Sequence, residues 1–251
     1  MTAVRIVGVD EDEYPAELAA ISSPPARLWV RGSLPPPDVV AVVGARRPTG
    51  FGRRVAEAVA RSAVEAGLGV VAGLATGVDT IAHRSTLDAG GQTWAVLGSG
   101  VDRPSPAANT VLADVIVRSG GGLIAEVPPG TARSARWLVA RDRIQAGLSL
   151  AVIVCQCDMG SGAMHTARFA LIQHRLLVVV RPHGRDAGVP ASAGNLVLSD
   201  PEGCDPATLS ARGEAAEMIR MRRPAADVVI DRREQLPELW SRLRQGPSRS
   251  D

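Results

Sequence analysis

The sequence predicts an α/β fold built on a doubly wound, mostly parallel sheet, with a short N-terminal lead-in and a short C-terminal extension. Fully apolar runs of strand length alternate along the chain with segments whose apolar residues recur at helical spacing. This pattern is typical of parallel strands covered by helices on both faces. The 251 residues are 45% hydrophobic but only 3% aromatic, so we expect one medium-sized core made mainly of aliphatic side chains.

Each element follows from these runs. The run VVAVVG, at 39–44, predicts a buried strand, and the spacing of Val55, Ala58, Val59 and Ala63 predicts a helix over 51–66. In the third strand run, TWAVLGSG at 93–100, we expect Trp94 to belong to the core. The remaining predicted strands are 68–73, 93–100, 121–127, 148–157 and 176–182, and the remaining predicted helices are 78–89, 107–119, 135–147 and 160–174.

The two ends of the chain differ from this central pattern. Residues 1–38 contain YP, SPP and LPPP and are interpreted as a lead-in closed by a proline linker. Residues 39–213 form the predicted main domain, whose last part, 183–213, shows no clear period. In the extension, 214–251, we expect one short amphipathic helix at 234–243, followed by a disordered tail, RQGPSRSD.

Composition limits the possible classes of protein. The net charge of +2 indicates neither a nucleic-acid partner nor its absence, and the absence of lysine among 28 basic residues is interpreted as genomic bias. Cys155, Cys157 and Cys204 fit neither a disulfide framework nor a four-cysteine zinc site, so we expect buried, reduced thiols. No signal peptide and no membrane-spanning run is recognised, which predicts a soluble cytoplasmic protein without a membrane partner.

Glycine-rich loops follow four of the predicted strands, at 44–52, 73–77, 98–104 and 158–167. In an open parallel sheet, ligands bind beyond the carboxyl ends of the strands, where loop amides and helix N-termini favour anions. Together with nearby arginines, these loops predict a rim that binds phosphate or nucleic acid. The candidate residues are Gly44, Arg46, Arg47, Gly73, Gly77, Gly98, Ser99, Gly100, Arg141, Arg143, Ser161, Gly162 and Thr166.

Two features narrow this prediction. The loop GARRPTGFG is neither a Walker loop nor a GxGxxG fingerprint, which disfavours ATP hydrolysis and dinucleotide binding. Arg141 and Arg143 lie two positions apart in a predicted helix and cannot share one face, so at most one is expected to point at the ligand.

The stretch GLATGVDTIAH contains Asp79 and His83, four positions apart on one side of a predicted helix. They could act as a catalytic pair, but no nucleophile stands nearby, and a metal site would need a third ligand. We therefore favour a loop-shaping role in which the two side chains pair, and we expect no metal and no cofactor.

These motifs together resemble the DprA/Smf family of DNA-processing proteins, from about Tyr14 to Leu198. The pieces that match are VVGARRPTGFG, VVAGLATGVDTIAH, GGQTWAVLGSGVD, GGLIAEVPPG, ARDRIQAGLS and SGAMHTARFA. The resemblance implies a Rossmann-like domain in a cytoplasmic, non-enzymatic, dimer-forming protein. Such a protein binds single-stranded DNA and hands it to the RecA recombinase in natural transformation.

The resemblance also implies roles for particular residues. It assigns Gly44 and Arg46 to a DNA-facing basic pocket and matches Gly73, Gly77, Asp79 and His83 to the family signature. It matches Arg141 and Arg143 to an Arg-Asn-Arg motif, and Ser161, Gly162 and Thr166 to an SG-x-x-TA loop. Asp142 stands where that motif has asparagine, and Ser105-Pro106 where the family has Tyr-Pro, so altered ligand binding is one possible outcome.

Two other functions remain open from the sequence. The first is a nucleotide-binding or nucleotide-hydrolysing domain related to phosphoribohydrolases, in which Glu126, at the end of a strand, would be the catalytic candidate. The second is an interaction module whose terminal helix, containing Trp240, docks on a partner. The alternative for that helix is packing on its own domain.

Overall fold

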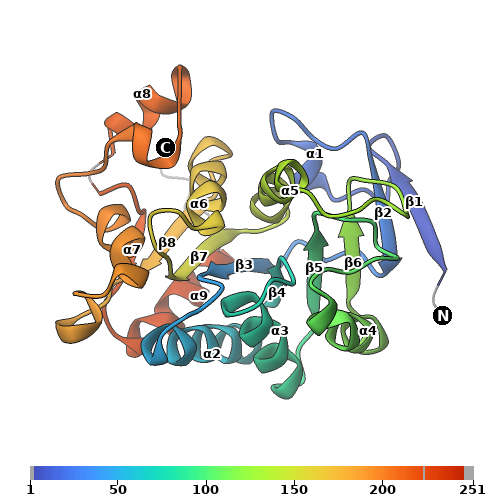
Figure 1. Cartoon of the computed structure of the whole chain (residues 1–251), viewed down its shortest axis with the longest axis horizontal. Helices are drawn as coiled ribbons and strands as arrows, with labels where there is room; N and C mark the ends of the chain where they lie inside the picture. Colours follow the sequence, from blue (N-terminus) through green and yellow to red (C-terminus); the bar gives the residue numbers. More distant parts are fainter. Residues whose placement is uncertain (1–2, 223, 246–251) are drawn as a thin grey trace.

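One mixed sheet organises the part of the chain that this computed structural model describes, residues 3–222 and 224–245. Its nine strands follow the order β1-β2-β6-β5-β4-β3-β7-β8-β9 (Figure 1). All neighbours from β6 to β9 pair in parallel, whereas β2 pairs antiparallel with β6 and β1 antiparallel with β2. The strands are β1 (Val4–Gly8), β2 (Arg27–Gly32), β3 (Val39–Gly44), β4 (Gly69–Ala72), β5 (Thr93–Leu97), β6 (Gly122–Ala125), β7 (Ala151–Gln156), β8 (Leu176–Val180) and β9 (Val228–Ile230).

The strand order reverses beside β3. The chain winds outward from β3 through β4 and β5 to β6, then returns to the other side of β3 at β7 and winds out through β8 to β9. This reversal is the topological switch point of a doubly wound sheet, beside which ligands bind in this class of fold. The predicted α/β class with a doubly wound, mostly parallel sheet is confirmed.

Helices cover both faces of the sheet (Figure 1). One face carries α2 (Gly50–Glu65), α3 (Val78–Asp88), α4 (Thr110–Arg118) and α9 (Leu236–Gln245). The other carries α1 (Ala16–Ala19), α5 (Ala135–Gly147), α6 (Gly162–Ile172), α7 (Ala193–Leu198) and α8 (Glu214–Arg220). Short 3₁₀ turns complete the connections: η1 (Ala107–Asn109), η2 (Gly184–Asp186), η3 (Pro190–Ser192), η4 (Pro206–Leu209) and η5 (Arg233–Gln235).

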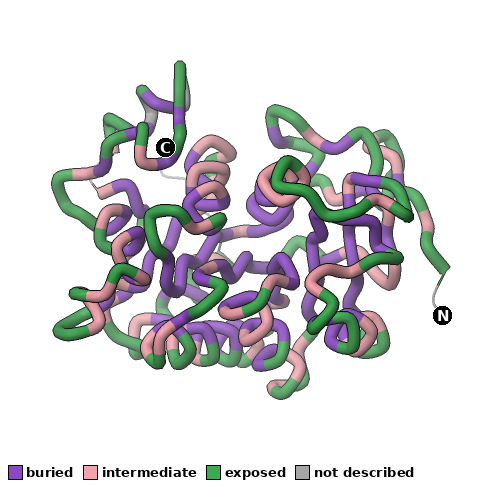
Figure 2. The backbone as a smooth tube through the Cα atoms, viewed as in Figure 1, coloured by how far each residue is buried: buried purple, intermediate pink, exposed green. Residues whose placement is uncertain are grey.

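The burial of the central strands explains why the sequence predicts them as continuous apolar runs. Every residue of β7 is buried, and in β3 only the last residue is partly exposed; Figure 2 shows this buried centre enclosed by helices that are partly exposed. Strands covered on both faces need apolar side chains at every position, so they appear as continuous apolar runs. Trp94 of β5 is buried, as expected. All six predicted strands are present, and α5 has the predicted bounds.

The N-terminal segment, which we interpreted from the sequence as a lead-in, contains two strands and a short helix. β1 and β2 extend the sheet beyond β6, and Leu18 and Leu28 are fully buried in the same cluster as Trp94. The Tyr14 hydroxyl donates a hydrogen bond to the carbonyl of Pro25, 2.8 Å away, which closes the loop between the two strands. The prolines of this segment therefore delimit short strands that the composition alone does not reveal.

The C-terminal helix packs on its own domain. The Trp240 side chain is 1% exposed, and its Nε1 donates to the Ser62 Oγ of α2 at 2.8 Å. Leu236 and Leu239 are buried in the same cluster. The predicted helix is present, but the hypothesis that its tryptophan docks on a partner is wrong. In the predicted tail, residues 246–251 lie outside the described part of the chain.

Among the described residues, none of the helices has both the length and the apolar character needed to cross a membrane.

Replacing Trp240 by alanine is expected to lower the free energy of unfolding by about 3–5 kcal/mol, because a large buried side chain and its hydrogen bond to Ser62 are lost. Urea unfolding followed by circular dichroism measures the change. The matched variant Arg242→Ala alters an exposed residue of the same helix and should change stability by less than about 0.5 kcal/mol. Equal stability of the two variants would contradict the packing described here.

Candidate functional site

A cavity of about 220 Å³ opens at the switch point, next to the carboxyl ends of β3 and β7. We call it the switch-point cavity. Segments far apart in the sequence contribute to it: the end of β3, the loops after β3 and β4, the inner side of α5 and the first turns of α6. Of the residues singled out in the sequence, it brings together Gly44, Arg46, Asp79, Arg141, Ser161, Gly162 and Thr166.

Other candidate residues lie outside the cavity lining. Arg47 is exposed beside it. The loop that contains Gly98, Ser99 and Gly100 packs against the start of α5 and the segment around Thr131, whose carbonyl accepts from the Gly100 amide at 3.0 Å. This loop follows β5, which lies two strands away from β3, so it does not reach the switch point.

Arg141 lies at the base of the cavity and is only 8% exposed. Its Nη1 donates to the carbonyl of Val96 at 2.9 Å, and its Nε lies 3.2 Å from a carboxylate oxygen of Asp142. The guanidinium rests against the backbone of Gly73, where an added Cβ would stand 1.5 Å from Nη1. Gly73 is therefore required because no side chain fits between this loop and the buried arginine.

Arg143 points in a different direction. Its Nη1 donates to Glu126 Oε2 at 2.8 Å, its Nη2 donates to Glu126 Oε1, and its Nε donates to the carbonyl of Ser23 at 3.0 Å. Neither Arg143 nor Glu126 lines the cavity. Only one of the two arginines faces the cavity, as the helical spacing requires. Glu126, the catalytic candidate of the alternative function, is held in a bidentate ion pair.

Asp79 fastens the glycine-rich loop that precedes it. Its Oδ2 accepts hydrogen bonds from the backbone amides of Gly73 at 3.0 Å and Ala75 at 3.1 Å. Burial raises the pKa of this carboxyl, while Arg141 and the two amides oppose the rise. The loop thus takes its shape from a carboxylate in the first turn of α3.

His83 does not pair with Asp79, contrary to the sequence-based expectation. The ring is fully buried, and its Nδ1 lies 2.7 Å from Thr93 Oγ1. The Thr93 hydroxyl donates to the carbonyl of Val70, so it accepts from His83 and the proton of the neutral ring is on Nδ1. Burial, helped by Arg141, lowers the pKa of His83 to about 3. His83 joins α3 to the sheet, while Asp79 turns toward the loop.

Gly77 allows the loops after β3 and β4 to meet. Its φ is +81°, and an added Cβ would stand 2.3 Å from the carbonyl oxygen of Ala45. The Val78 amide donates to this same carbonyl at 3.1 Å. The exposed Arg46, which follows Ala45, lines the same cavity as the buried Arg141.

Gln156 was missed by the sequence analysis as a structural residue of the site. Its Oε1 accepts from the Thr49 amide at 2.9 Å, and its Nε2 donates to Thr49 Oγ1 and to Ser192 Oγ, both at 2.9 Å. Gln156 therefore ties the loop after β3 to the end of β7 and to η3. The signal available in the sequence was an amide side chain at the end of an otherwise apolar strand.

His165 was also missed, although it lies in the quoted loop DMGSGAMHTA. It lines the cavity, and its Nδ1 has no hydrogen-bond partner among the described residues. Burial and the neighbouring charge of Arg168 lower the pKa of His165. The ring is therefore neutral at neutral pH, and its unpartnered Nδ1 is buried beside the cavity and not exposed to it.

Asp142 places a carboxyl group in the wall of the cavity and is 4% exposed. Its Oδ1 accepts from Gln145 Nε2 at 3.0 Å. Burial raises the pKa of Asp142 to about 7, against the attraction of Arg141, and the Asp79 carboxylate contributes further to the rise. The charge of the cavity therefore changes near neutral pH.

Truncating Asp79 should cost stability, because two backbone amides lose their acceptor. We expect Asp79→Ala to lower the free energy of unfolding by about 2–4 kcal/mol and Asp79→Asn, which keeps an acceptor oxygen, to lower it by less. Chemical denaturation measures both. Identical losses for the two variants would show that the hydrogen bonds of Asp79 do not hold the loop.

Asp142→Asn should change the pH dependence of stability. Between the ordinary pKa of 3.8 and about 7, the unfolded chain releases the Asp142 proton while the folded chain retains it. The stability of the natural chain relative to Asp142→Asn should therefore fall as pH rises through this window, by at most about 1.4 kcal/mol per pH unit, and level off above pH 7. Urea unfolding from pH 4.5 to 8.5 tests this, with the exposed Asp88→Asn as control. A flat difference would contradict the burial of Asp142.

Comparison with known proteins identifies the family to which this chain belongs. Residues 5–199 match the family model for DNA recombination-mediator protein A. The chain is 38% identical to the Smf protein of Synechocystis over 167 residues, which are 64% of this chain and 42% of that protein. It is 35% identical to a putative DNA processing protein DprA of Mycobacterium tuberculosis over 191 residues, 70% of this chain and 49% of that protein. The chain thus spans about half the length of these curated relatives.

Solved structures agree with the sequence matches. The X-ray structure of DprA from Streptococcus pneumoniae has a TM-score of 0.68 and 34% identity, covering 76% of this chain and 66% of that one. A Helicobacter pylori DprA structure, described in terms of a single-stranded DNA binding mode, has a TM-score of 0.66 and 26% identity, covering 77% of this chain and 85% of that one. The resemblance to DprA/Smf proteins is confirmed, and the chain belongs to the family of DNA recombination-mediator protein A.

Proposed function

We propose that this chain binds single-stranded DNA at the switch-point cavity and acts in the processing of incoming DNA, in uptake and transformation and in RecA-mediated recombination. The observation that carries the proposal is the convergence of Arg46, Arg141 and the N-terminus of α6 on one cavity. Family membership and the Helicobacter pylori relative's described binding mode support it.

The chemistry of the cavity suits a phosphodiester group. Arg46 offers an exposed guanidinium, which can form a bidentate contact with a phosphate. The N-terminus of α6 offers backbone amides and the positive end of an eleven-residue helix. Ser161, which lines the cavity, caps this helix by accepting from the Ala163 amide at 3.3 Å. A cavity of about 220 Å³ accommodates single groups of a flexible strand and not a duplex.

The composition of the wall predicts how affinity responds to salt. Among the described residues that line the cavity none is Phe, Tyr or Trp, so the imidazole of His165 is the one aromatic ring that they offer to a base. Binding would rest on backbone amides and guanidinium groups, and such contacts weaken steeply as salt concentration rises.

We infer a binding role and not a catalytic one. Glu126, the candidate base of a nucleotide hydrolase, is paired with Arg143 and lies outside the cavity lining. By family likeness we further propose a cytoplasmic location, homodimer formation and a RecA-type recombinase as protein partner, with no metal or cofactor. Co-sedimentation with a RecA-type recombinase and light scattering of the purified chain test the two assembly proposals.

Arg46→Ala should weaken binding of a fluorescein-labelled dT oligonucleotide by about tenfold or more, because a charge-assisted contact is lost. Fluorescence polarisation at salt concentrations from about 50 to 300 mM measures the affinity and its salt slope, which should be less steep in the variant. Arg118→Ala, an exposed arginine at the far end of α4, is the matched control and should bind as the natural chain does. Binding of nucleoside monophosphates without binding of the oligonucleotide would contradict the proposal and favour the nucleotide-binding alternative.

A further inference from the structure

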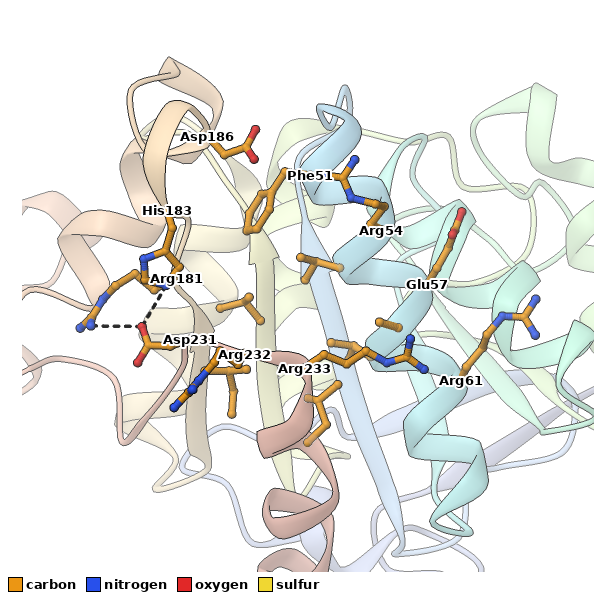
Figure 3. Close-up of a pocket in the computed structure, with 16 residues that line it drawn as sticks. Phe51, Arg54, Glu57, Arg61, Arg181, His183, Asp186, Asp231, Arg232 and Arg233 are labelled. Carbon is orange, nitrogen blue, oxygen red and sulfur yellow. Dashed lines mark hydrogen bonds and ion pairs between the residues drawn. The ribbon is translucent and has the colours of Figure 1, made fainter.

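A second and larger cavity, of about 530 Å³, lies on the opposite face of the sheet. It is bounded by α2 from Phe51 to Arg61, by the ends of β8 and β9 with the residues that follow them, and by η5 with the start of α9 (Figure 3). We call it the α2 groove. No residue in the described part of the chain lines both this groove and the switch-point cavity, so the two can be occupied at the same time.

The floor of the α2 groove is apolar. Its aliphatic side chains come from α2, from the ends of β8 and β9 and from α9, and the half-buried ring of Phe51 stands at one end (Figure 3). The floor residues are Val55, Ala58, Val59, Val180, Ile230 and Leu236. A groove of this size with an apolar floor can accommodate bulky apolar groups of a ligand.

The rim of the groove is cationic. It carries five arginines, at positions 54, 61, 181, 232 and 233, against the carboxylates of Glu57, Asp186 and Asp231. The Asp231 carboxylate already has two partners on the rim, because its Oδ1 lies 3.3 Å from Arg181 Nη1 and 3.2 Å from His183 Nε2 (Figure 3). Within the described part of the chain, the other four arginines form no ion pair. The rim therefore has an excess of positive charge around an apolar floor.

We propose that the α2 groove binds an acidic segment of a partner protein that carries at least one bulky apolar side chain. The apolar side chain would enter the floor beside Phe51, and the carboxylates would meet the arginines of the rim. Complementary rim charges raise the rate of association and restrict the choice of partner.

The groove suits a peptide better than a nucleic acid for two reasons. Of the described residues that line it, only Phe51 is a Phe, Tyr or Trp, whereas a strand of bases is normally held by several stacking platforms. Glu57 and Asp186 on the rim repel a backbone that is charged at every nucleotide. A peptide can place its carboxylates against the arginines alone.

The test uses three fluorescein-labelled synthetic decapeptides and the full chain. The first is built from Asp, Glu, Leu and Phe; the second replaces its acidic residues by Lys, and the third replaces Leu and Phe by Ser. Fluorescence polarisation should show that the first peptide binds at least about tenfold more tightly than either of the others.

Two variants locate the binding. Ala58→Trp fills the floor, and the double variant Arg54→Glu with Arg233→Glu reverses part of the rim charge; each should weaken binding of the first peptide by about tenfold or more. Arg118→Glu, with the same charge reversal on α4, should leave it unchanged. If Ala58→Trp proves unfolded by circular dichroism, the double variant, which changes only rim residues, decides the question.

The oligonucleotide separates this proposal from the proposed function. Both groove variants should bind the dT oligonucleotide as the natural chain does, whether or not the peptide result holds. Loss of oligonucleotide binding in the groove variants would assign the groove to nucleic acid, and a change in mass by light scattering would assign it to a second copy of the chain. Either result, or equal binding of the three peptides, overturns the proposal.

Discussion

A guanidinium group buried beneath the switch-point cavity sets the requirements that the surrounding residues meet. Arg141 cannot be left without partners in the interior, because burying an uncompensated charge is costly. The Val96 carbonyl and the Asp142 carboxylate supply those partners. The glycine at position 73 supplies the space, since any side chain there would overlap the guanidinium. The unusual lack of side-chain bulk after β4 therefore follows from the presence of a charge in the core of the site.

The same arrangement explains why acidic residues surround a site proposed to bind an anion. Asp79 and Asp142 are buried on the inner side of the cavity, near Arg141, whereas Arg46 is exposed. The carboxyl groups balance the inner arginine and leave the outer one for a ligand. Asp142, which stands where the DprA/Smf motif has asparagine, makes this balance sensitive to pH, because its carboxyl group titrates near neutrality.

The sequence predicted the fold and the meeting of the loops, but it did not predict side-chain direction. Buried parallel strands must be apolar throughout, so β3 to β8 were recognisable, whereas β1 and β2 at the antiparallel edge and the three-residue β9 carry no comparable signal. Parallel strands bring Gly44, Arg46 and Ser161 to one edge by topology alone. Arg143 and His83 turn away because their partners, Ser23 and Glu126 for one and Thr93 for the other, lie elsewhere in the chain. Helical spacing predicts that only one of Arg141 and Arg143 faces the cavity, but no local pattern tells which one, or that His83 pairs with Thr93.

The hydrogen bonds of Gln156 have a consequence for the thermodynamics of ligand capture. This one amide holds Thr49 at the start of α2 and Ser192 in η3, so the loop that carries Arg46 is anchored at its far end before anything binds. A backbone that is already ordered loses little conformational entropy on association. The loop is thus ordered before the ligand binds. The conformational entropy that binding still removes belongs mainly to the Arg46 side chain and to the incoming strand.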